Sequence, residues 1–183
     1  LEQLIVSRGW ENKVRIASIS GRYFAMDRDK RWDRVRKAWE AIVCATPSVD
    51  RGACDVVADS STEGVTDEFV VPCALDSRGV RDGDGVIFFN FRPDRARELT
   101  RAFVDPAFNG FERSVFPQVN FVCLTEYDPD IPAPVAFPKE FPDNVFADVL
   151  ATQGLRQYHI AETEKYAHVT FFLNGGREEP KAG

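Results

Sequence analysis

Residues 86–95 read Val-Ile-Phe-Phe-Asn-Phe-Arg-Pro-Asp-Arg, a continuous apolar run that passes directly into a helix start. Such a run, rich in Phe and β-branched side chains, is typical of a strand buried on both faces of a parallel sheet. Pro93 suits the first position of a helix and Asp94 its first turn. The stretch therefore predicts a buried strand followed by a helix that extends to about Val104.

Apolar strand-like runs and amphipathic helices alternate along the rest of the chain. Trp32, Val35 and Trp39 fall on one face of a predicted helix over 31–45, at helical spacing. Further helices are expected over 1–9, 49–62 and 144–153, strands over 13–19, 66–75, 119–125, 156–161 and 168–173, and a Pro-rich linker over 129–142. This order predicts an α/β fold, with a mixed, mostly parallel sheet flanked by helices in three layers.

The composition is that of a globular protein with locally concentrated positive charge. Apolar residues make up 44% of the 183 residues, and the net charge is −6. The negative balance argues against nucleic acid or an anionic membrane as a partner, and no apolar run is long enough to span a bilayer. Because the four cysteines form no C-x-x-C pair and the two histidines lack ligand spacing, we expect reduced thiols and no metal site made by this chain alone.

Three cationic segments follow predicted strands. Arg22 and Arg28 surround a Gly turn, Arg92 and Arg95 open the helix after residue 91, and Lys165 follows the strand predicted over 156–161. Ligands of open α/β sheets gather at the carboxyl ends of strands, so we expect these segments to converge. A cation in the first turn of a helix costs about 0.3–1 kcal/mol, unless an anion occupies the helix start. The pattern predicts a site for a small dianion, gripped by guanidinium forks.

Each segment also has a purely structural interpretation. Arg95 could form an ion pair with Asp94 or Glu98 on a hydrated surface. The aspartates of the first segment could neutralise its own arginines, and Lys165 could be an ordinary surface lysine. The residues alone leave these alternatives open.

Four ordered stretches of this sequence resemble the cofactor-independent phosphoglycerate mutases. They are SGRYFAMDRDKRWDRV (20–35), IFFNFRPDRARELT (87–100), FVCLTEYD (121–128) and AETEKYAHVTFFLNGGREE (161–179). The likeness extends over nearly the whole chain and is loosest at 46–64, 76–84, 105–118 and 128–142.

The resemblance implies an isomerase of glycolysis and gluconeogenesis that interconverts 3-phosphoglycerate and 2-phosphoglycerate through a phosphoserine intermediate. Members have an alkaline-phosphatase-like domain with two Mn²⁺ ions and an inserted phosphotransferase domain. By this resemblance, residues 1–139 belong to the inserted, substrate-binding domain, truncated at its N-terminal side. Residues 140–183 then begin the return into the phosphatase-like domain.

The resemblance also assigns roles to five residues. Arg22 and Arg28 map onto ligands of the glycerate and its carboxylate, Arg92 and Arg95 onto the phosphate site, and Lys165 onto a catalytic cation that meets the transferring phosphoryl group. The nucleophilic Ser, the Mn²⁺ ligands and the family's Asp-Gly-Arg-Asp loop fall outside this sequence. We therefore expect an inactive, monomeric, cytoplasmic fragment whose partners are phosphoglycerate and the rest of the mutase chain. Two alternatives remain: another phosphomutase of the alkaline phosphatase superfamily, or a free-standing anion-binding or regulatory module.

Overall fold

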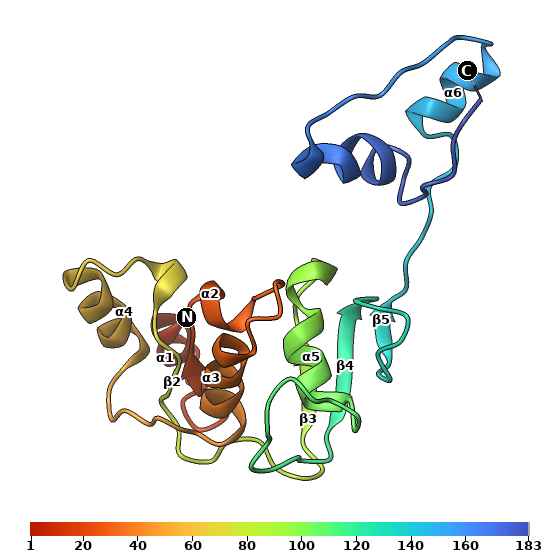
Figure 1. The fold of residues 1–183 in the computed structure, drawn as a ribbon. Helices are drawn as coiled ribbons and strands as arrows, with labels where there is room; N and C mark the ends of the chain where they lie inside the picture. The colour runs from red at the N-terminus through yellow and green to blue at the C-terminus, as the bar shows by residue number, and fades with distance from the viewer. Residues whose placement is uncertain (183) are drawn as a thin grey trace. The chain divides into compact units, whose positions relative to one another are not determined.

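The first part of the chain is built on a parallel three-stranded sheet. The computed structural model describes residues 1–182, and its first compact unit is Leu1–Pro138. Its sheet has the order β3 (Gly85–Phe88), β4 (Asn120–Thr125) and β5 (Val135–Phe137), all parallel (Figure 1). Helix α5 (Arg97–Val104) lies between β3 and β4 in the sequence, as a β-α-β connection requires. The predicted α/β class is confirmed.

The core of this unit lies between the sheet and two helices. Figure 1 shows α5 between β4 and α3 (Trp32–Val43), the amphipathic helix expected over 31–45. Apolar side chains from all three elements are buried together, with Trp39 and Cys123 each 1% exposed. The buried members are Val35, Trp39 and Val43 of α3, Leu99, Ala102 and Phe103 of α5, and Phe121 and Cys123 of β4. No helix among the described residues combines the length and apolarity needed to cross a membrane.

The prediction that residues 86–91 are buried on both faces is wrong. The strand is shorter, and β3 lies at an end of its sheet. Val86 and Phe88 pack toward the core, whereas Ile87 is 72% exposed and Phe89 85% exposed. Successive side chains of a strand point to opposite faces, so a continuous apolar run leaves every second residue uncovered where helices lie on one face alone. Within the described residues of this unit, helix cover reaches one face of the three-stranded sheet.

The remaining strands of the first unit form a second, smaller sheet. β1 (Ser18–Ile19) pairs antiparallel with β2 (Cys73–Ala74), so the strands expected over 13–19 and 66–75 are short and belong to a separate sheet. The elements around it are α1 (Glu2–Ser7), α2 (Arg22–Ala25), α4 (Ala53–Thr62) and the 3-10 helix η1 (Asp67–Phe69). Gly21 is the N-cap of α2 and lies against η1, where a Cβ on it would be 2.3 Å from the carbonyl oxygen of Glu68.

The second unit begins at Lys139 and contains helical turns where strands were expected. It holds α6 (Phe146–Thr152), the 3-10 turn η3 (Thr163–Lys165) and a π-helix, η4 (His168–Phe172). The strand predictions for 156–161 and 168–173 are therefore wrong. The aromatic and β-branched run at 168–173 has strand-like composition, but its main chain bonds locally, for example from Leu173 N–H to the His168 carbonyl at 3.1 Å. The segment 129–142 is also not a simple linker, because it contains β5.

Replacing Trp39 by Ala is expected to lower the free energy of unfolding by about 3–5 kcal/mol, since it empties a large volume between α3 and the rest of the core. Urea unfolding followed by circular dichroism measures the change. Trp10→Ala is the matched control, because Trp10 is 42% exposed and its loss should cost about 1 kcal/mol or less. Equal losses in the two variants would contradict the core described here.

Candidate anion-binding site

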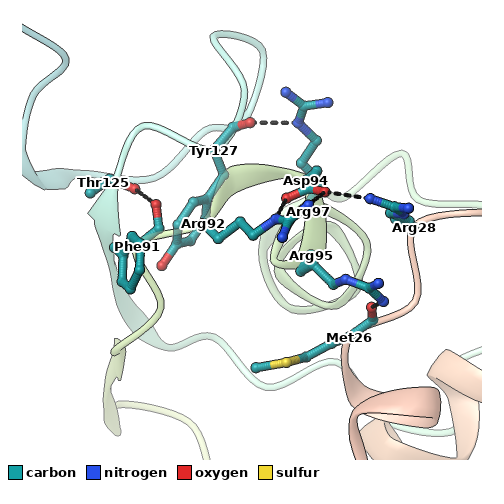
Figure 2. A network of polar contacts seen from close by, with 9 residues as sticks. All are labelled: Met26, Arg28, Phe91, Arg92, Asp94, Arg95, Arg97, Thr125 and Tyr127. Carbon is teal, nitrogen blue, oxygen red and sulfur yellow. Dashed lines mark hydrogen bonds and ion pairs between the residues drawn. The ribbon is translucent and has the colours of Figure 1, made fainter. Parts of the chain in front are cut away.

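The ends of β3 and β4 are tied together by side chains. Thr125 Oγ1 donates to the Phe91 carbonyl at 2.9 Å, and the Tyr127 hydroxyl donates to the Phe88 carbonyl at 2.8 Å. Arg97 Nε in turn donates to the Tyr127 carbonyl at 2.6 Å (Figure 2). Tyr127 is 2% exposed, and burial raises the pKa of its phenol, which keeps it a donor. These bonds fix the main chain from which Arg92 projects.

Arg92 and Arg28 share one carboxylate. Arg92 binds Asp94 with two nitrogens, Nε to Oδ1 at 2.7 Å and Nη2 to Oδ2 at 3.0 Å. Arg28 Nη1 reaches the same Oδ2 at 3.0 Å (Figure 2). Partial burial opposes ionisation of Asp94, but the hydrogen bonds from Arg92 and Arg28 hold its pKa below the ordinary value. The two arginines, far apart in the sequence, are therefore held side by side by an ionised Asp94.

Arg95 joins the same cluster through the main chain. Its Nη1 donates to the Met26 carbonyl at 3.0 Å, two residues before Arg28. In the structure Arg95 thus contacts a carbonyl, whereas Arg92 takes the ion pair with Asp94 that the sequence allowed for Arg95. Arg28, Arg92 and Arg95 are brought together. Their meeting point differs from the expected one, because β1 and β3 belong to different sheets and the contact runs between the α2–α3 loop and the 3-10 turn η2 (Pro93–Arg95).

The other two predicted residues have different surroundings. Arg22 is the first residue of α2, and its Nη2 lies 3.1 Å from Oε2 of Glu68. Lys165 is the last residue of η3 in the second unit, where its side chain is exposed. The arginines themselves are on an open surface, with side chains 46% exposed at Arg28 and 59% exposed at Arg92. Two surface hollows of about 310 and 410 Å³ are lined by none of the five predicted residues.

Two buried carboxyl groups beneath the cluster were not predicted as part of the site. Asp27 is 5% exposed, and its Oδ2 accepts the N–H groups of Asp29 and Arg31 at 2.9 Å each. Glu98 is 7% exposed, and its Oε1 accepts the N–H of Lys30 at 2.8 Å. The bond from Asp29 N–H to Asp27 is an Asx turn, a local arrangement that Asp favours and that can be predicted from sequence. The contact between this loop and Glu98 spans 68 positions, so no local pattern reveals it.

The two carboxyls have opposite tendencies to ionise. Burial raises the pKa of Glu98 to about 7, and the nearby charges of Asp27 and Asp29 raise it further. The hydrogen bond from Lys30 N–H acts in the opposite direction and lowers this pKa. Burial also opposes the charge on Asp27, but the N–H groups of Arg31 and Asp29 and the neighbouring Glu98 hold its pKa below the ordinary value. Around neutral pH, Asp27 carries the charge and Glu98 holds a proton for part of the time.

Comparison with known proteins decides the family. The family model described as "BPG-independent PGAM N-terminus" matches residues 1–129, and a metalloenzyme superfamily model matches residues 135–183. The chain belongs to the BPG-independent phosphoglycerate mutase family. Arg22, Arg28, Arg92 and Arg95 all lie in the first matched region, and Lys165 lies in the second.

Curated members of this mutase family are similar over most of the chain. A 2,3-bisphosphoglycerate-independent phosphoglycerate mutase of Trichodesmium erythraeum is 53% identical over 92% of this chain and 32% of its own length. The corresponding protein of Synechococcus elongatus is 50% identical over 100% of this chain and 34% of its own length. The chain thus spans about a third of the curated relatives it matches.

A solved structure of the family agrees with the fold. A crystal structure of Leishmania mexicana phosphoglycerate mutase, determined at low cobalt concentration, matches with a TM-score of 0.73 and 33% identity. The match covers 98% of this chain and 35% of that protein. Among residues 1–182 of this family member, no three His, Cys, Asp or Glu side chains gather closely enough to hold a metal ion.

In this mutase segment, Tyr127→Phe is expected to lower the free energy of unfolding by about 1–3 kcal/mol, because the Phe88 carbonyl at the end of β3 loses its donor. Urea unfolding provides the measurement. Tyr158→Phe, at a residue 85% exposed, removes the same hydroxyl elsewhere and should change stability by about 0.5 kcal/mol or less. A neutral Tyr127→Phe would show that the hydroxyl does not hold the strand ends together.

Proposed function

We propose that this chain is the substrate-binding part of a phosphoglycerate mutase that interconverts 3-phosphoglycerate and 2-phosphoglycerate through a phosphoserine intermediate. The observation that carries the proposal is the meeting of Arg28, Arg92 and Arg95 from two distant segments of a mutase-family chain. A phosphorylated hydroxy acid offers two anionic groups, and guanidinium forks bind such oxygens in pairs. Three guanidinium groups that are partly exposed and held close together suit this class of ligand.

Under this proposal the arginines retain the substrate while it turns. Arg92 and Arg95 hold the phosphate, and Arg22 and Arg28 hold the glycerate through its carboxylate. Each charge-assisted hydrogen bond contributes about 1.5–3 kcal/mol, so the glycerate remains in place after the phosphoryl group has left it. Its second hydroxyl then replaces the first at the phosphoryl group. This part of the protein therefore acts by positioning rather than by bond breaking.

The remaining chemistry is proposed for the phosphatase-like part of the protein. Residues 1–139 are assigned to the substrate-binding domain and 140–183 to the start of the second domain, where Lys165 meets the transferring phosphoryl group. The Ser nucleophile and the ligands of two Mn²⁺ ions are assigned to segments outside residues 1–183. When bound, such ions activate the nucleophile and neutralise phosphoryl charge. The chain alone is expected to be an inactive monomer, and the whole protein is expected in the cytoplasm.

In the full-length protein, Arg92→Ala is expected to lower kcat/KM for 3-phosphoglycerate at least about tenfold, because two charge-assisted bonds to the phosphate are lost. A coupled assay of 2-phosphoglycerate formation measures this. Arg36→Ala is the matched control, since Arg36 pairs with Glu40 on the surface of α3. Unchanged activity in folded Arg92→Ala would remove the anion role of this helix start. Turnover by the 183-residue chain alone would show that the chemistry is not divided as proposed.

Metal removal separates the two proposed parts. A chelator should abolish turnover by the full-length protein, and Mn²⁺ should restore it, because the metals are proposed to act on the nucleophile. The affinity of the 183-residue chain for 3-phosphoglycerate, measured by calorimetry, should stay the same with and without the chelator. Metal-dependent binding to the chain alone would contradict the assignment of the metal ligands to other segments.

A further inference from the structure

We propose that Glu98 and Asp27 act as a positioning pair, which holds the loop that carries Arg28 against α5 while the two carboxyls share one proton. Glu98 is thereby a positioning residue of the anion site, acting through the loop rather than on the ligand. The proposal rests on the proposed function only in that it takes Arg28 to be part of an anion site. The pair itself is a property of this chain.

The 3-10 turn η2 and the start of α5 contact the loop at three points. Arg95 donates to the Met26 carbonyl at 3.0 Å, Asp94 accepts from Arg28 at 3.0 Å, and Glu98 accepts from Lys30 N–H at 2.8 Å. Asp94 and Arg95 belong to η2, and Glu98 lies in the first turn of α5, which follows after Ala96. The first two contacts belong to the cationic cluster. The third anchors the far end of the loop and is the only one of the three that is made by a nearly buried side chain.

The loop needs this anchor because its main chain is strained at the anchored residue. Lys30 has a φ of 57°, in the left-handed region that residues other than Gly, Asn and Asp seldom adopt. A residue persists in that conformation when its surroundings impose it. The bond from Lys30 N–H to Glu98 is placed to impose it. Without this bond, the loop is expected to relax and to move Arg28 away from Arg92.

The second oxygen of Glu98 requires a proton. Oε2 is buried and has no hydrogen-bond donor as a partner among the described residues. The neighbouring acidic group is Asp27, whose charge raises the pKa of Glu98. The Asp27 carboxyl already accepts two N–H groups and lies 3.3 Å from Arg34 Nη1. Two neighbouring buried carboxylates repel each other, whereas a protonated Glu98 can donate to Asp27. The arrangement is therefore complete with one proton on the pair.

The charged groups around the pair give the direction of its pH dependence. Asp27 and Asp29 disfavour the ionised form of Glu98, Arg34 favours the ionised form of Asp27, and Arg95 makes its bond to the neighbouring Met26 carbonyl. A raised pKa on Glu98 means that its contribution is present at acidic pH and is lost as pH rises through about 7. A lowered pKa on Asp27 means that its contribution is lost only in stronger acid. The loop should be held best in mild acid.

The test uses Glu98→Gln, which keeps the acceptor for Lys30 N–H and carries a permanent N–H donor toward Asp27. Hydrogen exchange of the Lys30 amide in the 183-residue chain reports the anchor without any ligand. In the parent chain, the protection factor at Lys30 should fall at least fivefold between pH 6 and pH 8.5, whereas in Glu98→Gln it should stay constant. Glu40→Gln makes the same change in the surface pair with Arg36 and should retain the parent profile. Equal pH profiles in Glu98→Gln and the parent would overturn the proposal.

A second variant and a second readout complete the test. Lys30→Gly keeps the N–H and removes the left-handed strain, so it should reduce the pH dependence of the loop; a parent-like profile would count against the proposal. In the full-length protein, the ratio of KM for Glu98→Gln to KM for the parent should fall as pH rises. Taking the ratio at each pH removes the effect of ionisation of the substrate phosphate, which is the same for both proteins. A constant ratio, despite altered Lys30 exchange, would mean that the loop does not position the anion site. If Arg92→Ala also left kcat/KM unchanged, the proposed function itself would fail.

Discussion

The carboxylate of Asp94 allows the segments that carry Arg28 and Arg92 to lie against each other. Unpaired guanidinium groups about 4 Å apart near a protein surface repel each other by roughly 4 kcal/mol. The Asp94 carboxylate accepts from both Arg92 and Arg28, so the charges that would separate the segments hold them together instead. Exposed ion pairs by themselves contribute little. The geometry therefore also depends on the partly buried hydrogen bonds from Arg95 to the Met26 carbonyl and from Lys30 N–H to Glu98.

The two sides of the cluster are held by different kinds of contact. Arg92 projects from main chain that is fixed by Tyr127 and by the buried packing of α5 on β4. Arg28 projects from a loop held by polar contacts and containing one residue in the left-handed region. The same loop is where protonation of Glu98 can influence binding without touching the ligand.

Local sequence patterns predicted the elements that support the site better than the contacts within it. The helical spacing of Trp32, Val35 and Trp39 predicted α3, and Pro93 predicted a helical start, where the structure has η2. The run at 168–173 misled because its aromatic and β-branched side chains suit a strand, while its main chain closes π-helical bonds. The bond between Glu98 and Lys30 N–H joins segments that are distant in the sequence, so the periodicity of a single sequence cannot predict it. The roles of all five residues remain predictions: Arg22, Arg28, Arg92, Arg95 and Lys165.

The central claim is that arginines from two segments, held by one carboxylate, bind a single phosphorylated hydroxy acid. The most direct measurement is a crystal structure of the full-length protein with 3-phosphoglycerate bound. The account predicts that guanidinium nitrogens of Arg28, Arg92 and Arg95 lie within hydrogen-bonding distance of the same ligand molecule, with Glu98 still bonded to Lys30 N–H. A ligand bound elsewhere, with these three side chains pointing into solvent, would contradict it.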